Sequence, residues 1–165
     1  PIYPFVKIKN RVSITTDFEA KNYKYWTYDW RMSFDKSSNY ETWDSKGYRK
    51  RFFKIAGSLF PSENIKIRTE FRIKKEKEWL NWIDSNHLAT YDLNQRIVSL
   101  NLNWFKGVKH EIRLKSQFVA LEAKRPKSLF TDVNGVLFDS SKKVNPFSSG
   151  INSFQIRYKL SLIHI

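Results

Sequence analysis

Apolar and polar residues alternate along most of this chain. Between residues 26 and 34 every even position is apolar and every odd position is polar or charged. Between residues 65 and 73 four of the five odd positions are Ile or Phe, and all four even positions are charged. The same alternation recurs in 12–18, 53–59, 98–104, 112–120 and 154–158. A period of two is typical of β-strands, so the sequence predicts seven strands, and a short pattern at 5–9 indicates one more.

The two faces of these strands differ sharply in composition. The seven apolar rows hold 30 positions, and none of them is charged. The 23 positions between them include 11 charged residues and only two apolar ones, Ala56 and Val119. A helix would mix the two classes on every face. The pattern therefore predicts an all-β fold, an antiparallel up-and-down meander of about seven to eight strands.

The connections between these strands alternate in length. Residues 20–25, 61–64 and 106–107 form short connections, whereas 35–48, 75–95 and 122–153 form long polar ones. Gly107 suits a tight hairpin turn because glycine tolerates positive φ. Short turns at one end and long loops at the other are typical of outer-membrane barrels. A strand of about 11 residues spans ~36 Å, or ~25 Å when tilted by ~45°, which matches the apolar band of such barrels. We therefore expect part of a transmembrane β-barrel.

Alternation alone does not decide which face meets water. In a soluble barrel the apolar rows point inward, whereas in a membrane barrel they face lipid. The loop rhythm, the bulk of the apolar rows and the aromatic residues at strand ends favour the membrane arrangement, since aromatic rings gather at bilayer interfaces. Packing in an ordinary core is the alternative for each ring. The interfacial aromatic candidates are Trp26, Phe60, Trp79 and Trp104.

The polar face is rich in basic residues. Three acidic residues accompany them, namely Asp17, Asp29 and Glu70. If this face lines a lumen, its cationic wall favours anions. The alternative, which we favour at this stage, is a plugged or mixed-charge lumen whose charges pair with strands outside this sequence. The lumen-facing basic candidates are Arg31, Lys54, Lys66, Arg68, Arg72, Arg113, Lys115 and Arg157.

Composition narrows the class of protein. The chain has 165 residues, a net charge of +14 and 41% hydrophobic residues, so an intrinsically disordered chain is excluded. It has no Cys, which excludes disulfides, thiolate zinc sites and cysteine nucleophiles. No apolar stretch approaches the ~18 residues of a transmembrane helix. This criterion does not detect the strands of a membrane barrel, because their alternating residues have a polar average hydropathy.

Motifs that carry chemistry are weak. We find no nucleophile elbow, Walker loop, dinucleotide loop or zinc-protease motif. His87 and His110 are isolated and are interpreted as surface residues rather than metal ligands. Asp17 and Glu19 share a face but are expected to pair with basic residues across the sheet rather than to act as a glycosidase pair. Residues 132–135 are expected to form a plain turn, because the ligand series of a calcium loop is incomplete. The sequence predicts no catalytic residue, cofactor or metal, and it leaves open whether the protein is an enzyme.

The ends of the chain bear on its organisation. It begins at Pro1, without an initiator Met or signal peptide, so we expect a fragment. Residues 160–165 resemble the translation of a sequencing adapter, and we expect the native sequence to stop near Lys159. We therefore predict that 1–159 is the C-terminal part of an outer-membrane barrel and that 160–165 is a non-native tail.

Several segments resemble the C-terminal region of the DUF5916 family of bacterial outer-membrane proteins, over most of residues 10–159. The resemblance implies a barrel in a Gram-negative outer membrane, in contact with lipid and lipopolysaccharide and inserted by the barrel-assembly machinery. It also implies a glycan-binding domain upstream, because members often carry one similar to carbohydrate-binding module family 9. It implies no active-site residue in this region. The segments that carry the resemblance are 15–23, 25–28, 78–82, 88–91, 104–105, 110–115 and 154–158.

Two functions from different classes follow. The first is a membrane anchor or pore that serves an upstream carbohydrate-binding or hydrolase-like domain. The second is a soluble basic β-domain that binds polyanions such as nucleic acid. A platform for single-stranded nucleic acid needs aromatic and basic residues on one face. Here they lie on opposite faces, which argues against nucleic acid as a partner.

Overall fold

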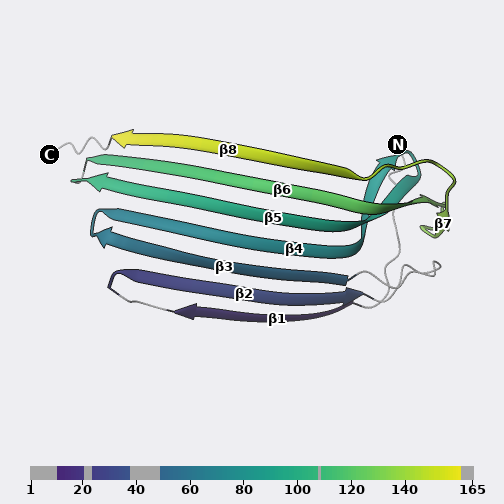
Figure 1. Cartoon of the computed structure of the whole chain (residues 1–165), viewed down its shortest axis with the longest axis horizontal. Coiled ribbons are helices and arrows are strands. Elements are labelled where there is room, and N and C mark those ends of the chain that lie inside the picture. Colours follow the sequence, from purple (N-terminus) through teal and green to yellow (C-terminus); the bar gives the residue numbers. More distant parts are fainter. Residues whose placement is uncertain (1–10, 21–23, 38–48, 108, 161–165) are drawn as a thin grey trace.

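The structure is a computed structural model of the chain and describes residues 11–20, 24–37, 49–107 and 109–160. All strands belong to one antiparallel sheet (Figure 1). This confirms the predicted all-β meander, while the short pattern at 5–9 lies outside the described residues. The strands are β1 (Arg11–Ala20), β2 (Trp26–Ser37), β3 (Arg49–Ser62), β4 (Ile65–Asp84), β5 (His87–Lys106), β6 (His110–Thr131), β7 (Leu137–Asp139) and β8 (Phe147–Leu160).

The strands pair in chain order from β1 to β6 and form a curled half-barrel sheet. β7 and β8 both pair with β6, β7 with Leu129–Thr131 and β8 with His110–Ala123. They therefore lie one after the other along the same edge of β6. The described residues contain no helix that could cross a membrane. Leu160 pairs with His110 at the end of β8, and residues 161–165 lie outside the described part of the chain.

The register aligns the alternation of one strand with that of the next. One row of paired residues runs from β1 to β6 and is apolar throughout. Because side chains in a strand alternate between faces, one aligned row places all the apolar rows on the same face. We call this side the apolar face and the other the charged face. The aligned row is Phe18, Trp30, Ile55, Phe71, Val98 and Phe118.

The structure corrects two of the predicted connections. Residues 75–95 were expected to form a long loop, but β4 and β5 continue through them and meet at a turn of two residues, Ser85 and Asn86. Within 122–153, β6 continues to Thr131, and β7 and the start of β8 also lie in this range. The alternation fails here because the pairing slips at bulges, between Glu76 and Trp79 and between Thr90 and Asp92. A bulge adds one residue to a strand and shifts the phase of its pattern.

The extended ends of β4, β5 and β6 form a small folded unit of their own, which we call the cap (residues 78–92 and 123–144). Leu88, Leu129 and Leu137 are buried together in it. A second cluster surrounds Tyr91, and burial raises the pKa of its phenol. Figure 1 shows β4 and β5 curving sharply where the cap begins. The cap therefore has a core that the rest of the sheet lacks.

Two strained residues lie where the cap begins. Glu78 in β4 and Arg125 in β6 have positive φ angles of 56° and 50°. Both stand at the slips in pairing that flank β5. Positive φ is costly for residues other than glycine, and bulges bend the strand that carries them. The bend that sets the cap apart is therefore built from strained backbone.

Candidate functional site

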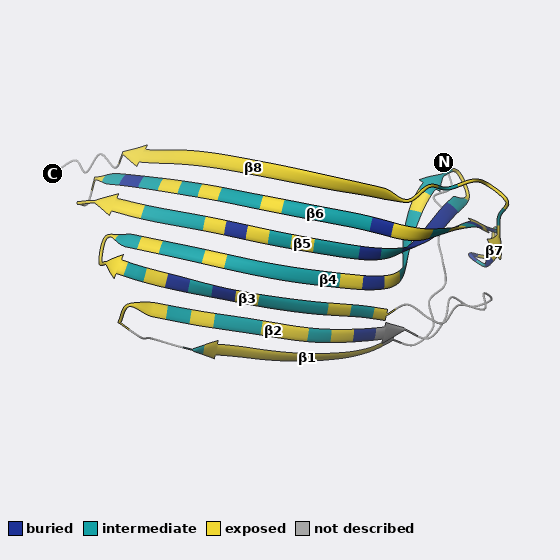
Figure 2. Cartoon of the chain, viewed as in Figure 1, coloured by how far each residue is buried: buried dark blue, intermediate teal, exposed yellow. Residues whose placement is uncertain are grey.

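The apolar face is uncovered. Large side chains along it remain widely exposed, with Ile14 at 61%, Leu59 at 56% and Leu100 at 46% (Figure 2). On the charged face the small residues Ala56 and Ser58 are only 3% and 2% exposed. Within the described residues, no second layer packs on the apolar side. The closed apolar interior of a soluble barrel is not what these strands form.

The apolar rows make a band of defined height. On β4 the band runs from Ile65 to Ile73, which at ~3.4 Å per residue is about 27 Å along the strand. A tilt of ~40° reduces this to roughly 21 Å, close to the ~25 Å band of outer-membrane barrels. Arg96, paired with Ile73, is the charged residue in the last of these rows. The band therefore has about the height of a bilayer core.

Aromatic and polar side chains mark the band at the short-turn end. Trp26 stacks near Tyr28, with ring centroids 5.5 Å apart. Trp104 pairs with Ile65 in the first row of the band. His110 Nδ1 lies 2.6 Å from the hydroxyl of Tyr158. Trp26 and Trp104 thus stand at a boundary of the apolar band, where the sequence predicts them.

The other two aromatic candidates lie elsewhere. Phe60 follows Leu59, so alternation places it toward the charged face, and Lys66 Nζ lies 5.5 Å from its ring centroid. Trp79 belongs to the cap, where its ring centroid is 6.1 Å from that of Tyr91. Trp79 therefore packs in the small core beyond the band. The sequence did not indicate this because Trp79 follows a bulge that no pattern marks.

Most of the predicted basic residues on the charged face have acidic partners within the same sheet. Asp29 in β2 accepts hydrogen bonds from Lys54 at 2.7 Å and from Arg68 at 2.6 Å. Glu70 lies beside the same Lys54, with their charged atoms 3.8 Å apart, and is also bonded to Arg72. These five residues come from three adjacent strands. They form one network, which we call the central ion network.

Further pairs extend this pattern along the sheet. Arg31 lies 2.5 Å from Asp17, as expected for a carboxylate with a basic neighbour across the sheet. Arg113 bonds Glu111 on its own strand. Five of the eight predicted basic residues thus have acidic partners in the sheet itself. The sequence did not identify Glu111, nor the pairs beyond the predicted strand ends. Those pairs are Lys50–Asp35 and Lys74–Glu76.

The remaining three basic candidates lie toward the short-turn end. Lys66, Lys115 and Arg157 have no ion pair within the part of the chain that the structure describes. Arg157 stands directly opposite Arg113 in the pairing of β6 with β8. Like charges directly opposite each other destabilise a sheet. A cavity of about 150 Å³ lies here, lined by Glu111, Arg113, Arg157 and Lys159. The charged face is therefore neutralised near its centre and cationic toward its short-turn end.

The weaker candidates have ordinary structural roles. The carboxylate of Asp132 accepts hydrogen bonds from the backbone amides of Asn134 and Val136, at 2.9 and 2.8 Å. Gly135 takes a φ of 77° in the same turn, which confirms the predicted plain turn. His87 begins β5 rather than lying in a loop, and its Nδ1 is 3.3 Å from Asp84. These residues do not converge on a shared site.

No family model, curated protein or solved structure matches the chain.

Proposed function

We propose that this chain forms part of the wall of an outer-membrane β-barrel, with the apolar face toward lipid and the charged face toward the lumen. The observation that carries the proposal is the contrast between the two faces. One face exposes aligned apolar rows over about the height of a bilayer core. On the other face, five of the eight predicted basic residues have acidic partners within the sheet. Strands β2 to β6 each pair on both sides, so their backbone groups can be buried in hydrocarbon with hydrogen-bond partners, whereas the outer edges of β1 and β8 require further strands to close the barrel.

The charges on the charged face favour a lumen filled with water rather than one filled by an apolar plug. Its central ion network carries two acids and three bases, and these side chains are partly exposed, from 11% to 41%. Such a wall is costly to cover with apolar groups because charges would be desolvated. Toward the short-turn end Lys66, Lys115 and Arg157 leave a net positive charge. A lumen lined in this way would favour anions by electrostatic attraction.

The proposed role is that of an anchor or pore for a domain upstream of this chain. The link to carbohydrate rests on the DUF5916 resemblance alone. In that arrangement lipid and lipopolysaccharide contact the apolar face, and the barrel-assembly machinery inserts the strands. The full-length gene would test the upstream part, because the proposal requires a signal peptide, further strands and a glycan-binding domain in it.

Fractionation tests the membrane part of the proposal. The full protein, expressed in a Gram-negative host, should enter the outer-membrane fraction and need detergent for extraction. Its unheated form should migrate differently from its boiled form on a gel, because closed barrels resist the detergent until heated. Purification from the cytosol without detergent, with no change of mobility on heating, would contradict the proposal and favour the soluble polyanion-binding alternative.

A further inference from the structure

Four cations stand together on the apolar face of β3 and β4, just beyond the last apolar residues of these two strands, Phe53 and Ile73. Arg51 pairs directly with Lys75, and Arg49 pairs directly with Lys77. Alternation places all four on the side of Phe53 and the apolar rows. We call this group the basic square. Two like-charged pairs in succession are unfavourable in a sheet, where opposite residues have Cβ atoms only ~5 Å apart.

The acidic residues near the basic square already have cations of their own. Glu76 lies 3.0 Å from Lys74, and Glu122 lies 2.8 Å from Lys124. A third acid, Asp92, lies 3.2 Å from Arg125. Arg49, Arg51, Lys75 and Lys77 have no ion pair with any residue that the structure describes. Their repulsion is therefore not relieved within the described sheet.

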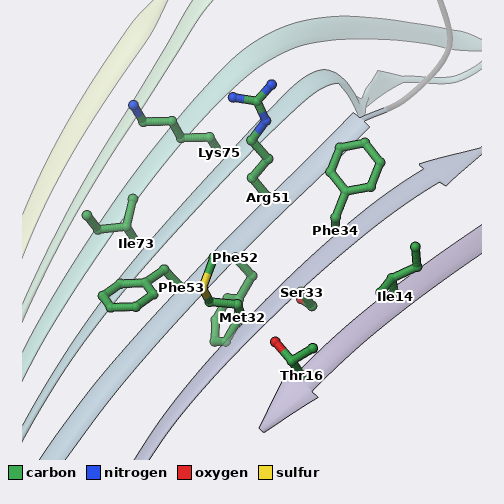
Figure 3. Close-up of a pocket in the computed structure, with 10 residues that line it drawn as sticks. All are labelled: Ile14, Thr16, Met32, Ser33, Phe34, Arg51, Phe52, Phe53, Ile73 and Lys75. Atoms are coloured by element: carbon green, nitrogen blue, oxygen red, sulfur yellow. The ribbon is translucent and has the colours of Figure 1, made fainter.

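An apolar groove of about 530 Å³ runs across β1 to β4 beside the basic square, and Arg51 and Lys75 belong to its lining. Met32, Phe53 and Ile73 form one row of its lining (Figure 3). Phe34, Arg51 and Lys75 form the neighbouring row, in which the two cations lie side by side. Its volume falls within the ~300–1,000 Å³ that is usual for small-ligand sites. An apolar groove flanked by paired cations is complementary to an acyl chain joined to a phosphate.

We infer that the basic square and its groove bind a phosphate-bearing lipid, with the phosphate between Arg51 and Lys75 and an acyl chain along Met32 and Phe53. Arginine grips phosphate with two parallel hydrogen bonds, and lysine adds a point charge. The inference rests on the proposed function. In outer-membrane barrels the short turns face the periplasm and the longer segments face the cell exterior, so in that arrangement the cap side is external. The lipid is then the phosphorylated glycolipid of the outer leaflet, lipopolysaccharide.

The test compares two double variants of the full protein in neutral phosphatidylcholine nanodiscs. Arg51→Gln with Lys75→Gln removes half of the basic square. The matched control, Lys106→Gln with Lys109→Gln, removes the same charge at the short-turn end. The probes are lipid A with both phosphates, dephosphorylated lipid A and inorganic phosphate. The readouts are the apparent Kd from native mass spectrometry and the midpoint temperature of heat-modifiable gel mobility.

We expect the square variant to bind bis-phosphorylated lipid A at least tenfold more weakly than the wild type, with the control within about twofold. Without lipid A, the square variant should have the higher midpoint temperature, because a like-charged pair is removed. With lipid A this order should reverse. The single variant Arg51→Lys should retain binding within a few fold, which gives a second test if the double variant does not fold.

Three results would overturn the inference while leaving the proposed function intact. They are equal affinity of the square variant and wild type, equal binding of phosphorylated and dephosphorylated lipid A, and full competition by inorganic phosphate, which would indicate a free-anion site. Failure of the wild type to insert into neutral bilayers at all would instead overturn the proposed function. The two failures are therefore distinguishable in one experiment.

Discussion

Leu100→Arg is the substitution that best tests which solvent meets the apolar face. Leu100 lies on the apolar face near the middle of the band, where it pairs with Thr69 on β4 and Ser116 on β6. It is four positions from Trp104 at one limit of the band and four positions from Arg96 at the other. At ~3.4 Å per residue, it lies about 14 Å along the strand from each limit. A charge at this position would lie near the bilayer midplane.

The expected magnitude differs sharply between the two environments. An arginine facing lipid at the midplane of a barrel costs about 2–4 kcal/mol in the free energy of unfolding. Leu100 is 46% exposed in the sheet itself. If water met this face, an arginine there would change stability by no more than about 0.5 kcal/mol, as is usual for surface substitutions. The two outcomes are separated by several times the error of an unfolding titration.

Gln117→Arg provides the matched control. Gln117 lies on the charged face of β6, between Ser99 and Ser153 in the pairing, so the same cation is introduced at a similar depth. The assay is urea unfolding of the full protein from phosphatidylcholine vesicles, followed by tryptophan fluorescence. We expect Leu100→Arg to lose about 2–4 kcal/mol and Gln117→Arg less than about 1 kcal/mol. Equal and small losses in both variants would refute the assignment of hydrocarbon to the apolar face.

Three further changes probe the backbone and the cap. Arg125→Gly relieves a strained φ of 50° and removes only a surface ion pair with Asp92. In a urea titration, its free energy of unfolding should therefore be unchanged or higher by about 1 kcal/mol, and a clear loss would contradict this. Gly107→Ala should lower that free energy by about 1–2 kcal/mol, since φ is +61° while the added Cβ meets nothing within 4 Å, and an unchanged urea midpoint would speak against it. The hydrogen bond from Lys142 lowers the pKa of Asp84, so this contact stabilises the cap above the ordinary aspartate pKa of ~3.9 and is lost as pH falls below it. Amide exchange in 140–143, corrected for intrinsic rates, should therefore rise at low pH in the wild type but not in Asp84→Asn, and identical pH profiles would exclude the contact as the cause.

The sheet was predictable from sequence because its alternation is continuous. All seven predicted strands lie within strands of the structure, and the turn at Gly107 has the positive φ that was expected. The cap was not predictable, because the alternation is interrupted where the cap begins. Two bulges break the period of two at Glu76–Trp79 and Thr90–Asp92, so the residues beyond them no longer match a strand pattern. Local alternation reports on strands only where pairing is regular.

The pairing of charges could not be read from the sequence either. Alternation places Lys54 and Arg68 on one face, but only the register brings both to Asp29 on a third strand. Arg68 and Asp29, which are hydrogen-bonded in this network, are 39 positions apart in the chain. The sequence-based interpretation favoured partners outside this chain for these cations. Partners within the sheet satisfy five of the eight, so the charged face carries fewer unpaired cations than the composition suggests.

The positions of the unpaired charges bear on whether the apolar face meets lipid or water, a question that the alternation alone leaves open. On the charged face, the central cations meet acids across neighbouring strands, as expected where the wall must hold its charges near a restricted volume of water. On the apolar face, the apolar residues of β3, β4 and β5 give way to the cations Arg51, Lys75 and Arg96, and Arg51 lies directly opposite Lys75. A surface bathed in water on both sides gives no reason for that boundary to coincide with the end of the apolar rows. A bilayer would, under the proposed function, because its phosphates begin where its hydrocarbon ends and would supply anions to cations that have no ion pair in the described residues.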